Sequence, residues 1–376
     1  MIKVLHIMTD ATLGGAGRVL IQLLRCFDRE RFEVVVAAPS GSALVPLIEE
    51  QGYRVIETEK GHDKTWEKGA VKEYKRIIRA EKPDIVHTHS SLAGKVAAYL
   101  CGVKSRIYTR HCVFDMPKKA TTFPGKQING LVNNTLATAV IAVAHAAKDN
   151  LTDTGVNPKK ITVIINGVEP LPMLSDVEKR DFRQKLGIAE DEFVGLISAR
   201  MEIYKGHSYL LETAKLLKEQ GKKIRLILMG DGSCRADLEQ QAKELGLEDT
   251  VLFTGFVTDV ASYVNISDLS LNCSYGTEAS SIALAEGMSL GKPSVVTDFG
   301  GNPYMITDGV NGLVVPQKDP QAMADAIARV MEEKGLYAKL VEGTRKEYQE
   351  KFTARAMTAQ VEALYESQVN KRKKES

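Results

Sequence analysis

The sequence carries almost no excess charge and few cysteines. Its 376 residues hold 50 Lys and Arg against 48 Asp and Glu, a formal net charge of +2, so no general electrostatic field predicts a nucleic-acid partner. The five cysteines are odd in number and include no Cys-x-x-Cys pair, which disfavours a disulfide framework or a zinc site. The cysteine pattern predicts a protein of the reducing cytoplasm.

Long apolar runs are also missing. The most apolar stretch, residues 136–147, is too short to cross a bilayer and is interrupted by Thr138 and His145. The first eight residues have the pattern of a strand rather than that of a signal peptide. We therefore expect no integral membrane segment.

Short apolar runs alternate with stretches of helical length along the chain, which is the pattern of parallel sheets covered by helices. In the first half the candidate strands are residues 4–8, 32–38, 54–57, 84–88, 107–110, 139–143 and 161–165. In the second half they are residues 194–198, 224–229, 251–254, 269–272, 294–297 and 312–315. The fold class is therefore predicted to be α/β.

A turn and proline stretch at residues 166–172 separates the two series and is the expected linker. The chain length also predicts two domains. We place them at residues 1–168 and 169–355, with residues 356–376 forming a C-terminal helix and a basic tail. Ligands of open parallel sheets bind beyond the carboxyl ends of the strands, so the loops that follow strands are the candidate binding segments.

Two glutamates, Glu278 and Glu286, stand eight residues apart around a predicted helix start. Ser280 and Ser281 are good N-terminal caps, and residues 282–290 are compatible with a helix followed by a stop signal. Glu278 should lie on the loop before the helix, and Glu286 about two turns inside it. Because a helix N-terminus attracts phosphate and carboxylates accept hydrogen bonds from hydroxyls, the segment predicts a ligand that carries both phosphate and sugar groups.

Two further loops follow predicted strands. Gly14 and Gly15 would let backbone N–H groups approach a phosphate or a sugar closely. Their spacing departs from the dinucleotide fingerprint, because its third glycine would fall on Leu20, and a hydride-transfer enzyme is disfavoured. Arg200 and Lys205 lie before a helix in the second half, and together they suit a diphosphate whose negative charge grows as it leaves.

These features occur in an order that resembles glycosyltransferase family 4. In the second half the matching segments are Arg200 with Lys205, residues 230–232, residues 253–257, Glu278 with Glu286, and residues 291–293. In the first half they are Gly14 with Gly15, residues 84–89, residues 109–111 and residues 165–168. The resemblance covers nearly the whole chain, and its most specific part is the Arg/Lys pair combined with the Glu-x7-Glu spacing.

The resemblance implies a GT-B architecture, with two Rossmann-like domains facing across a cleft and a C-terminal helix returning to the N-terminal domain. Residues 1–168 would receive the acceptor and residues 169–355 would bind the donor. It also implies transfer of a hexose-type sugar with retention of anomeric configuration, without a metal or other cofactor. The sequence contains no Asp-x-Asp that would hold a divalent ion. The co-substrate would be a nucleoside-diphosphate sugar, and a UDP-sugar is the preferred candidate.

The resemblance also implies roles on the donor side. Glu286 would bind the ribose hydroxyls, Glu278 the hydroxyls of the transferred hexose, and the amides near Ser280, Ser281 and Ile282 the diphosphate and sugar. The other expected donor-binding residues lie on loops after strands: Gly15, Arg200, Lys205, Gly232 and Val257.

On the acceptor side, the resemblance places His111 beside the reacting bond, with Gly14 and His89 lining the same region. The residues expected to be catalytic are His111, Arg200, Lys205 and Glu278. No residue is expected to hold a metal.

Three other interpretations are weaker. Glu278 and Glu286 could be the paired carboxylates of a hydrolase, which must face each other at about 5 Å, but the nearby cations favour phosphate. Residues 287–291 match Gly-x-Ser-x-Gly, yet their serine falls late in a predicted helix rather than on a strand-to-helix turn. His87 and His89 could share a metal, but no acidic or cysteine pattern completes that site, so acceptor lining or a structural role is favoured.

Two basic stretches, residues 64–82 and the group Lys118, Lys119 and Lys126, could rest on an anionic membrane and bring a lipid-linked acceptor to the site. A solvated helix face is the alternative. The predicted function is hexosyl transfer to a glycan, lipid-linked or small hydroxyl acceptor in the cytoplasm, with peripheral contact at the inner membrane face left open. The rival functions are a sugar-nucleotide epimerase or phosphorylase of the same architecture, or a non-catalytic nucleotide-sugar binding module.

Overall fold

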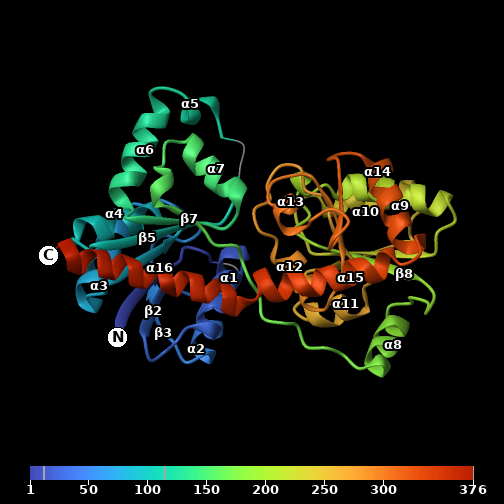
Figure 1. Ribbon diagram of the computed structural model, residues 1–376, viewed down its shortest axis with the longest axis horizontal. Coiled ribbons are helices and arrows are strands. Elements are labelled where there is room, and N and C mark those ends of the chain that lie inside the picture. The colour runs from blue at the N-terminus through green and yellow to red at the C-terminus, as the bar shows by residue number, and fades with distance from the viewer. Residues whose placement is uncertain (12, 114–115, 376) are drawn as a thin grey trace. The chain divides into compact units, whose positions relative to one another are not determined.

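The protein consists of two compact units, each built on one parallel sheet (Figure 1). The computed structural model describes residues 1–11, 13–113 and 116–375. Unit 1 comprises Met1–Gly167 together with Ala354–Ser376, and unit 2 comprises Val168–Thr353. The chain therefore crosses between units at residues 167–168 and 353–354. The sequence analysis placed these boundaries slightly later, at residues 168–169 and 355–356.

The sheet of unit 1 has the strand order β3-β2-β1-β4-β5-β6-β7, and its neighbouring strands are parallel. Its strands are β1 Ile2–Ile7, β2 Phe32–Pro39, β3 Arg54–Thr58, β4 Ile85–His89, β5 Ser105–Arg110, β6 Ala139–Ala142 and β7 Ile161–Val163. Each overlaps a predicted strand. An order that starts in the middle of the sheet and grows outward in both directions is that of a Rossmann-like fold.

Helices cover both faces of this sheet. They are α1 Gly15–Cys26, α2 Leu44–Glu50, α3 Ala70–Glu81, α4 Leu92–Leu100, α5 Lys118–Thr121, α6 Gly125–Leu136, α7 His145–Asp153, the short 3-10 helix η1 Pro158–Lys160, and α16 Ala354–Glu375. Alternate residues of a strand face opposite sides, and Leu5 and Ile7 of β1 pack in one core with Tyr74 of α3 and Ala97 of α4. The intervening His6 therefore faces the other side of the sheet.

The C-terminal helix α16 belongs to unit 1, which confirms the predicted return of the chain to the N-terminal domain. It packs against α1, and Figure 1 shows it running along unit 1. Tyr365 in its middle is fully buried. Glu362 of the same helix forms an ion pair with Arg31 at 3.0 Å, so apolar burial and a charge contact both fix the helix in place.

The sheet of unit 2 has the order β10-β9-β8-β11-β12-β13, again with parallel neighbours. Its strands are β8 Phe193–Ser198, β9 Ile224–Met229, β10 Val251–Gly255, β11 Leu269–Asn272, β12 Ser294–Thr297 and β13 Gly312–Val315. These strands also overlap the predicted ones. Both sheets thus have the same winding, and the predicted pair of Rossmann-like domains is confirmed.

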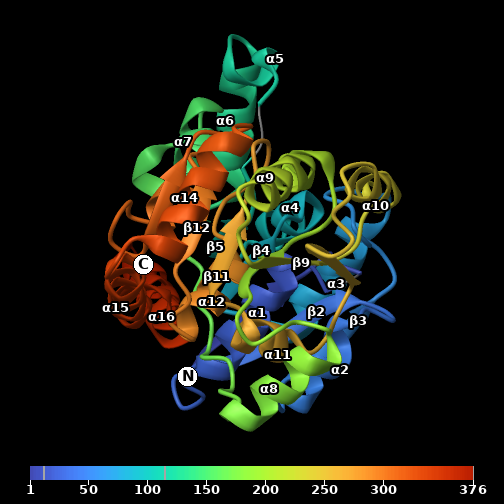
Figure 2. The ribbon, with the colours of Figure 1, turned by 90° about the vertical axis from the view of Figure 1, so that its right-hand side faces the viewer.

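Two layers of helices enclose the sheet of unit 2 (Figure 2). Leu226 and Leu228 of β9 pack in one core with α9, α10 and α14, whereas Ile227 and Met229 join a second core with α8 and α11. The helical segments are α8 Asp176–Lys185, η2 Ile203–Lys205, α9 His207–Glu219, α10 Arg235–Glu244, α11 Val260–Ile266, α12 Ile282–Ser289, α13 Asn302–Met305, α14 Pro320–Glu332, α15 Leu336–Glu347 and the π-helical η3 Tyr348–Phe352.

The predicted linker at residues 166–172 is held by hydrogen bonds on its unit 2 side. The amide of Val168 donates to the carbonyl of Phe352 at 2.9 Å, and Tyr348 Oη donates to the carbonyl of Val168 at 2.9 Å. The amide of Leu171 donates to Ser289 Oγ at 3.2 Å. The segment from Val168 onward is therefore part of unit 2.

Candidate active site

Helix α12 of unit 2 begins where the sequence predicted. Ser281 is its N-cap, and the Ser281 side chain accepts a hydrogen bond from the amide of Leu284. Glu278 lies on the loop before the helix and Glu286 lies in its second turn. Ser289 Oγ donates to the carbonyl of Glu286 at 2.6 Å, so this serine closes a helical turn and is no nucleophile.

Glu278 is buried and accepts several hydrogen bonds through one oxygen. Its Oε2 accepts from Lys205 Nζ at 2.9 Å, from Asn272 Nδ2 at 3.0 Å and from Ser274 Oγ at 3.0 Å. Burial raises the pKa of the Glu278 carboxyl, but the charge of Lys205 and these hydrogen bonds outweigh it, and the pKa is lowered overall. Among the described residues, the other oxygen of Glu278, Oε1, has no hydrogen-bond donor.

Lys205 reaches Glu278 because the backbone after β8 approaches β11 closely. Gly206 has a φ of +74°, and a side-chain Cβ at that position would lie 2.1 Å from the carbonyl oxygen of Cys273. Only glycine fits such a left-handed, crowded position. Lys205 Nζ also donates to the carbonyl of Thr277 at 3.0 Å. The sequence analysis gave Lys205 and Glu278 separate ligands, and it missed that they form a buried ion pair.

Arg200 stands apart from this pair. Its side chain is exposed, and its Nη2 donates to Tyr204 Oη at 3.4 Å. Glu286 is buried and lines a small pocket of unit 2 together with Ser198 and Ser270. This pocket lies at the carboxyl end of β8, where a ligand of a doubly wound sheet is expected.

The remaining residues expected around the donor occupy neighbouring loops. Gly232 follows β9, and a Cβ there would lie 2.5 Å from the carbonyl oxygen of Met201, so the loops after β8 and β9 are in backbone contact. Val257 follows β10 and packs at the edge of the second core of unit 2. A substituted Gly232 would push these loops apart.

The amides at the start of α12 are only partly engaged. The Ser281 N–H is directed at Met305 Sδ at 3.2 Å, and Ser280 Oγ lies 4.0 Å from the same sulfur. Sulfur is a weak acceptor. Among the described residues, the N–H groups of Ile282 and Ala283 have no acceptor outside the helix, which is the arrangement that binds an anion at a helix N-terminus.

In unit 1 the glycine loop lies at the start of α1. Gly14 is the N-cap, with extended backbone, and a Cβ on the exposed Gly15 would meet nothing within 4 Å. Neither glycine is therefore required by the fold itself. Asp10, which the sequence analysis missed, lies 3.5 Å from the Cβ position of Gly14. Burial and then the charge of Asp63 raise the pKa of the Asp10 carboxyl, against a hydrogen bond from the Gly17 backbone.

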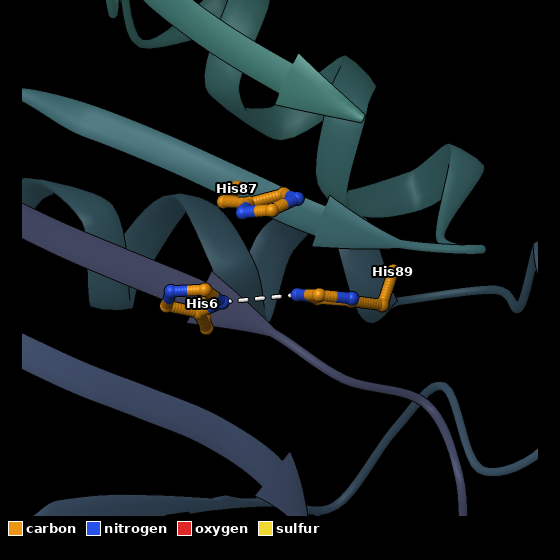
Figure 3. Close-up of side chains that lie close together, drawn as sticks. All are labelled: His6, His87 and His89. Atoms are coloured by element: carbon orange, nitrogen blue, oxygen red, sulfur yellow. Dashed lines mark hydrogen bonds between the residues drawn. The ribbon is translucent and has the colours of Figure 1, made fainter. Parts of the chain in front are cut away.

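Four histidines gather on one face of the unit 1 sheet. His6 of β1 and His87 of β4 are direct partners in the parallel register, and His89 follows His87 on the same face (Figure 3). His89 Nδ1 lies 2.8 Å from Nε2 of His111, which directly follows β5. The sequence analysis named His87, His89 and His111 but missed His6. Its alternation with apolar neighbours in a predicted strand was the available signal.

These imidazoles are neutral because they are buried. Burial lowers the pKa of His6 to about 3 and that of His111 to about 4. Burial, with the neighbouring histidines as a second cause, holds the pKa values of His87 and His89 well below the usual range. The pKa of Tyr365, which contacts both His6 and His87, is raised by burial. No member of the cluster is a charged acid or base at neutral pH.

Two family models together match most of the chain. The model described as "Glycosyl transferases group 1" matches residues 178–347, and the model described as "Glycosyltransferase Family 4" matches residues 13–170. The chain belongs to glycosyltransferase family 4. The predicted family and the predicted enzyme class are thereby confirmed.

Named relatives of this glycosyltransferase are of similar length. It is 25% identical over 346 residues to the UDP-Gal:alpha-D-GlcNAc-diphosphoundecaprenol alpha-1,3-galactosyltransferase of Escherichia coli, with 89% of each chain covered. It is 28% identical over 305 residues to the N-acetyl-alpha-D-glucosaminyl L-malate synthase of Bacillus anthracis, covering 77% of this chain and 76% of the relative.

Solved structures share the fold of the glycosyltransferase. A glycosyltransferase from Rickettsia africae superimposes with a TM-score of 0.83 at 20% identity, with 98% of both chains covered. Anabaena HepE in complex with UDP gives a TM-score of 0.83 at 22% identity, covering 97% of this chain and 100% of HepE. The matches support the GT-B assignment. No helix in the described part of the chain is long and apolar enough to span a membrane.

Proposed function

We propose that this glycosyltransferase moves a hexose from a UDP-sugar to a hydroxyl of a sugar that is itself carried on a lipid, with retention and without a metal. The observation that carries the proposal is the arrangement in unit 2 of a buried Glu278–Lys205 pair, a buried Glu286 in a pocket and unengaged amides at the start of α12. The carboxylates can accept hydrogen bonds from sugar hydroxyls, and the lysine and the helix amides can donate to phosphate oxygens.

The names of the relatives support a nucleotide-sugar donor. The Escherichia coli relative is named for UDP-Gal and for an acceptor on diphosphoundecaprenol. Anabaena HepE has been solved in complex with UDP and with UDP-glucose. The Bacillus anthracis relative is named N-acetyl-alpha-D-glucosaminyl L-malate synthase, so acceptors vary within the group, and the lipid-linked acceptor proposed here follows the Escherichia coli relative.

In the proposed mechanism, the site stabilises the leaving nucleoside diphosphate. Lys205 and the first amides of α12 face the growing charge, and each well-aimed donor contributes about 3 kcal/mol to transition-state stabilisation. Glu278 pairs with Lys205 and orients it, while its Oε1 accepts from a sugar hydroxyl. Glu286 accepts from the ribose hydroxyls. The departing phosphate oxygen takes the proton of the acceptor hydroxyl, so no protein nucleophile is needed.

Peripheral membrane contact would suit a lipid-linked acceptor. The connection between α5 and α6 of unit 1 exposes Phe123 (80%), and α6 exposes Ile128 (60%) and Leu131 (70%). In both views α5 lies at the outer end of α6 (Figures 1 and 2). Lys118 and Lys119 are exposed on α5. Apolar side chains flanked by lysines have the composition that binds an anionic bilayer surface.

The experiment is a donor panel of UDP-galactose, UDP-glucose, UDP-N-acetylglucosamine and GDP-mannose, observed by NMR with and without a polyprenyl-diphosphate sugar. We expect a UDP-sugar to bind, and its sugar to appear in the product with the same anomeric configuration as in the donor. An epimerase would interconvert donors without acceptor, and a silent binding module would bind the donor without turnover. Either result would refute the proposal.

A further inference from the structure

Six buried or half-buried groups of unit 1 form one unbroken chain of hydrogen bonds that ends at His111. The successive contacts are His111 Nε2 to His89 Nδ1 at 2.8 Å, His89 Nε2 to His6 Nδ1 at 2.9 Å, His6 Nε2 to Tyr365 Oη at 3.2 Å, Tyr365 Oη to His87 Nδ1 at 2.6 Å, and His87 Nε2 to Thr109 Oγ1 at 2.6 Å. We propose that this chain holds His111 as a neutral hydrogen-bonding group, which orients an oxygen of the ligand through Nδ1 and takes no proton during the reaction. The proposal rests on the function proposed above.

The hydrogen bonds along this chain couple the tautomers of the four histidine rings. A neutral imidazole has one N–H and one lone pair, so a ring that uses both nitrogens must donate with one and accept with the other. His89, His6 and His87 all use both nitrogens. Tyr365 Oη could accept from both His6 and His87, but its own O–H would then have no acceptor among the described residues. When it donates to one ring and accepts from the other, the direction of one contact sets the direction of every other contact. In one arrangement all four rings carry the proton on Nδ1, and in the other all four carry it on Nε2.

The chain has no exit for a proton. Its far end is the hydroxyl of Thr109, a residue that is only 4% exposed. Among the described residues, that hydroxyl has no hydrogen-bond partner other than His87. If His111 accepted a proton at Nδ1, either an imidazolium would form in a buried site or Thr109 would have to release a proton to nothing. Both outcomes are unfavourable. The chain of hydrogen bonds therefore positions His111 and prevents it from acting as an acid or a base.

The open end of the chain is at His111. Its Nδ1 is buried and has no partner among the described residues, although the residue as a whole is only half-buried. A buried polar atom without a partner is unusual in proteins. A ligand oxygen can complete this contact as a hydroxyl in either arrangement, or as a phosphate oxygen when Nδ1 carries the proton. His89, His6, Tyr365 and His87 are then positioning residues.

A shared metal ion fits the same histidines poorly. Nitrogens of His6, His87 and His89 lie within 4.8 Å of one another. His6 Nδ1 and His89 Nε2 face each other at 2.9 Å, whereas two imidazoles on one tetrahedral zinc ion, with Zn–N of about 2.0–2.1 Å, stand about 3.3 Å apart. Both nitrogens of His87 are already engaged by Tyr365 and Thr109. The geometry is that of a hydrogen-bonded row.

The direct test is the tautomer of each ring, read by long-range ¹H–¹⁵N NMR on the full chain at neutral pH without any donor. We expect His6, His87, His89 and His111 to be neutral and to carry the proton on the same ring nitrogen. A mixed set of tautomers, a protonated ring, or one equivalent of tightly bound zinc in the purified protein would overturn the proposal. Because no donor is added, this result is independent of the donor panel.

Substitutions test the role of the chain in turnover. Tyr365→Phe removes the contact between His6 and His87, and we expect the shared tautomer to be lost and kcat to fall about tenfold, the effect of one misdirected hydrogen bond. Tyr53→Phe is the matched control, because Tyr53 Oη is buried and donates to the carbonyl of Leu24 at 2.7 Å, outside the chain. Equal behaviour of the two variants would refute the positioning role.

His111 itself distinguishes orientation from proton transfer. Asparagine can hydrogen-bond near the position of Nδ1 but cannot act as a base, so His111→Asn should retain activity within about tenfold, whereas His111→Phe should lose about a hundredfold. An Asn variant as inactive as the Phe variant would show that His111 transfers a proton. If Tyr365→Phe fails to fold, the wild-type tautomers and the His111 pair still decide the question.

Discussion

Lys205 Nζ lies 2.9 Å from Glu278 Oε2, with only 14% and 10% of the two side chains exposed. The pair joins two loops that are 73 residues apart in the sequence. A buried carboxylate with a cation and two neutral donors is held ionised, and the lysine is in turn held against the loop that precedes α12. The site therefore contains a buried charge pair.

Glu278→Gln should destabilise unit 2 by about 1–3 kcal/mol, because Lys205 is left as an unpaired, largely buried cation. The measurement is urea unfolding at pH 7. Glu333→Gln is the control, since Glu333 pairs with Arg329 at the surface with about half of each side chain exposed, and we expect a change below about 0.5 kcal/mol. Similar losses in both variants would show that the Glu278 pair adds no stability.

The same carboxyl gives a pH dependence with a defined sign. The pKa of Glu278 is lowered in the folded state. The contribution of Glu278 to the free energy of unfolding is therefore fully present above its pKa in the unfolded chain, about 4.5, and is lost as the pH falls through its pKa in the folded protein. The stability difference between the wild type and Glu278→Gln should therefore shrink below about pH 4.5. A difference that grows on acidification would contradict the assigned direction.

Buried histidines should make the protein sensitive to mild acid. Burial lowers the pKa of His207 to about 4, so the unfolded chain binds a proton below about pH 6.5 that the folded chain refuses. Each such histidine therefore lowers the free energy of unfolding by up to about 1.4 kcal/mol for each unit by which the pH falls within that window. His207→Gln should reduce the slope of stability between pH 6.5 and 4.5.

The strands and helix α12 could be predicted because their signals are local. Alternating apolar runs located each strand of both sheets, and the serine cap located the start of α12. The Lys205–Glu278 pair could not be predicted, because it depends on the left-handed turn at Gly206 that brings β8 and β11 loops into contact. His6 was missed for a similar reason: its meeting with His87 depends on the register of β1 with β4.

Gly206→Ala should test that close approach. The new Cβ would lie 2.1 Å from the carbonyl oxygen of Cys273 in a backbone with φ of +74°, and we expect a loss above about 2 kcal/mol together with weaker donor binding. Gly221→Ala is matched in backbone, with φ of +70° and nothing within 4 Å of the added Cβ. It should cost about 1 kcal/mol. Equal costs would mean that the loops separate easily.

The membrane proposal predicts a local effect on unit 1. Leu131→Ser should lower binding to phosphatidylglycerol vesicles about tenfold, because one large apolar side chain no longer enters the bilayer. Met173→Ser, which alters an equally exposed side chain of unit 2, is the control and should bind normally. Cosedimentation at low and high salt measures both. Salt-insensitive binding, or equal loss in both variants, would exclude the proposed surface.

The central claim is that unit 2 holds a nucleotide sugar by two carboxylates with separate roles, and calorimetric titration of UDP and of the bound UDP-sugar tests it most directly. Glu286→Ala should lower the affinity for UDP itself by about tenfold, because the ribose contacts are lost, whereas Glu278→Ala should mainly lower the affinity for the UDP-sugar. Equal losses for both ligands in both variants, or no binding of any nucleotide sugar to the wild type at millimolar concentration, would contradict the account.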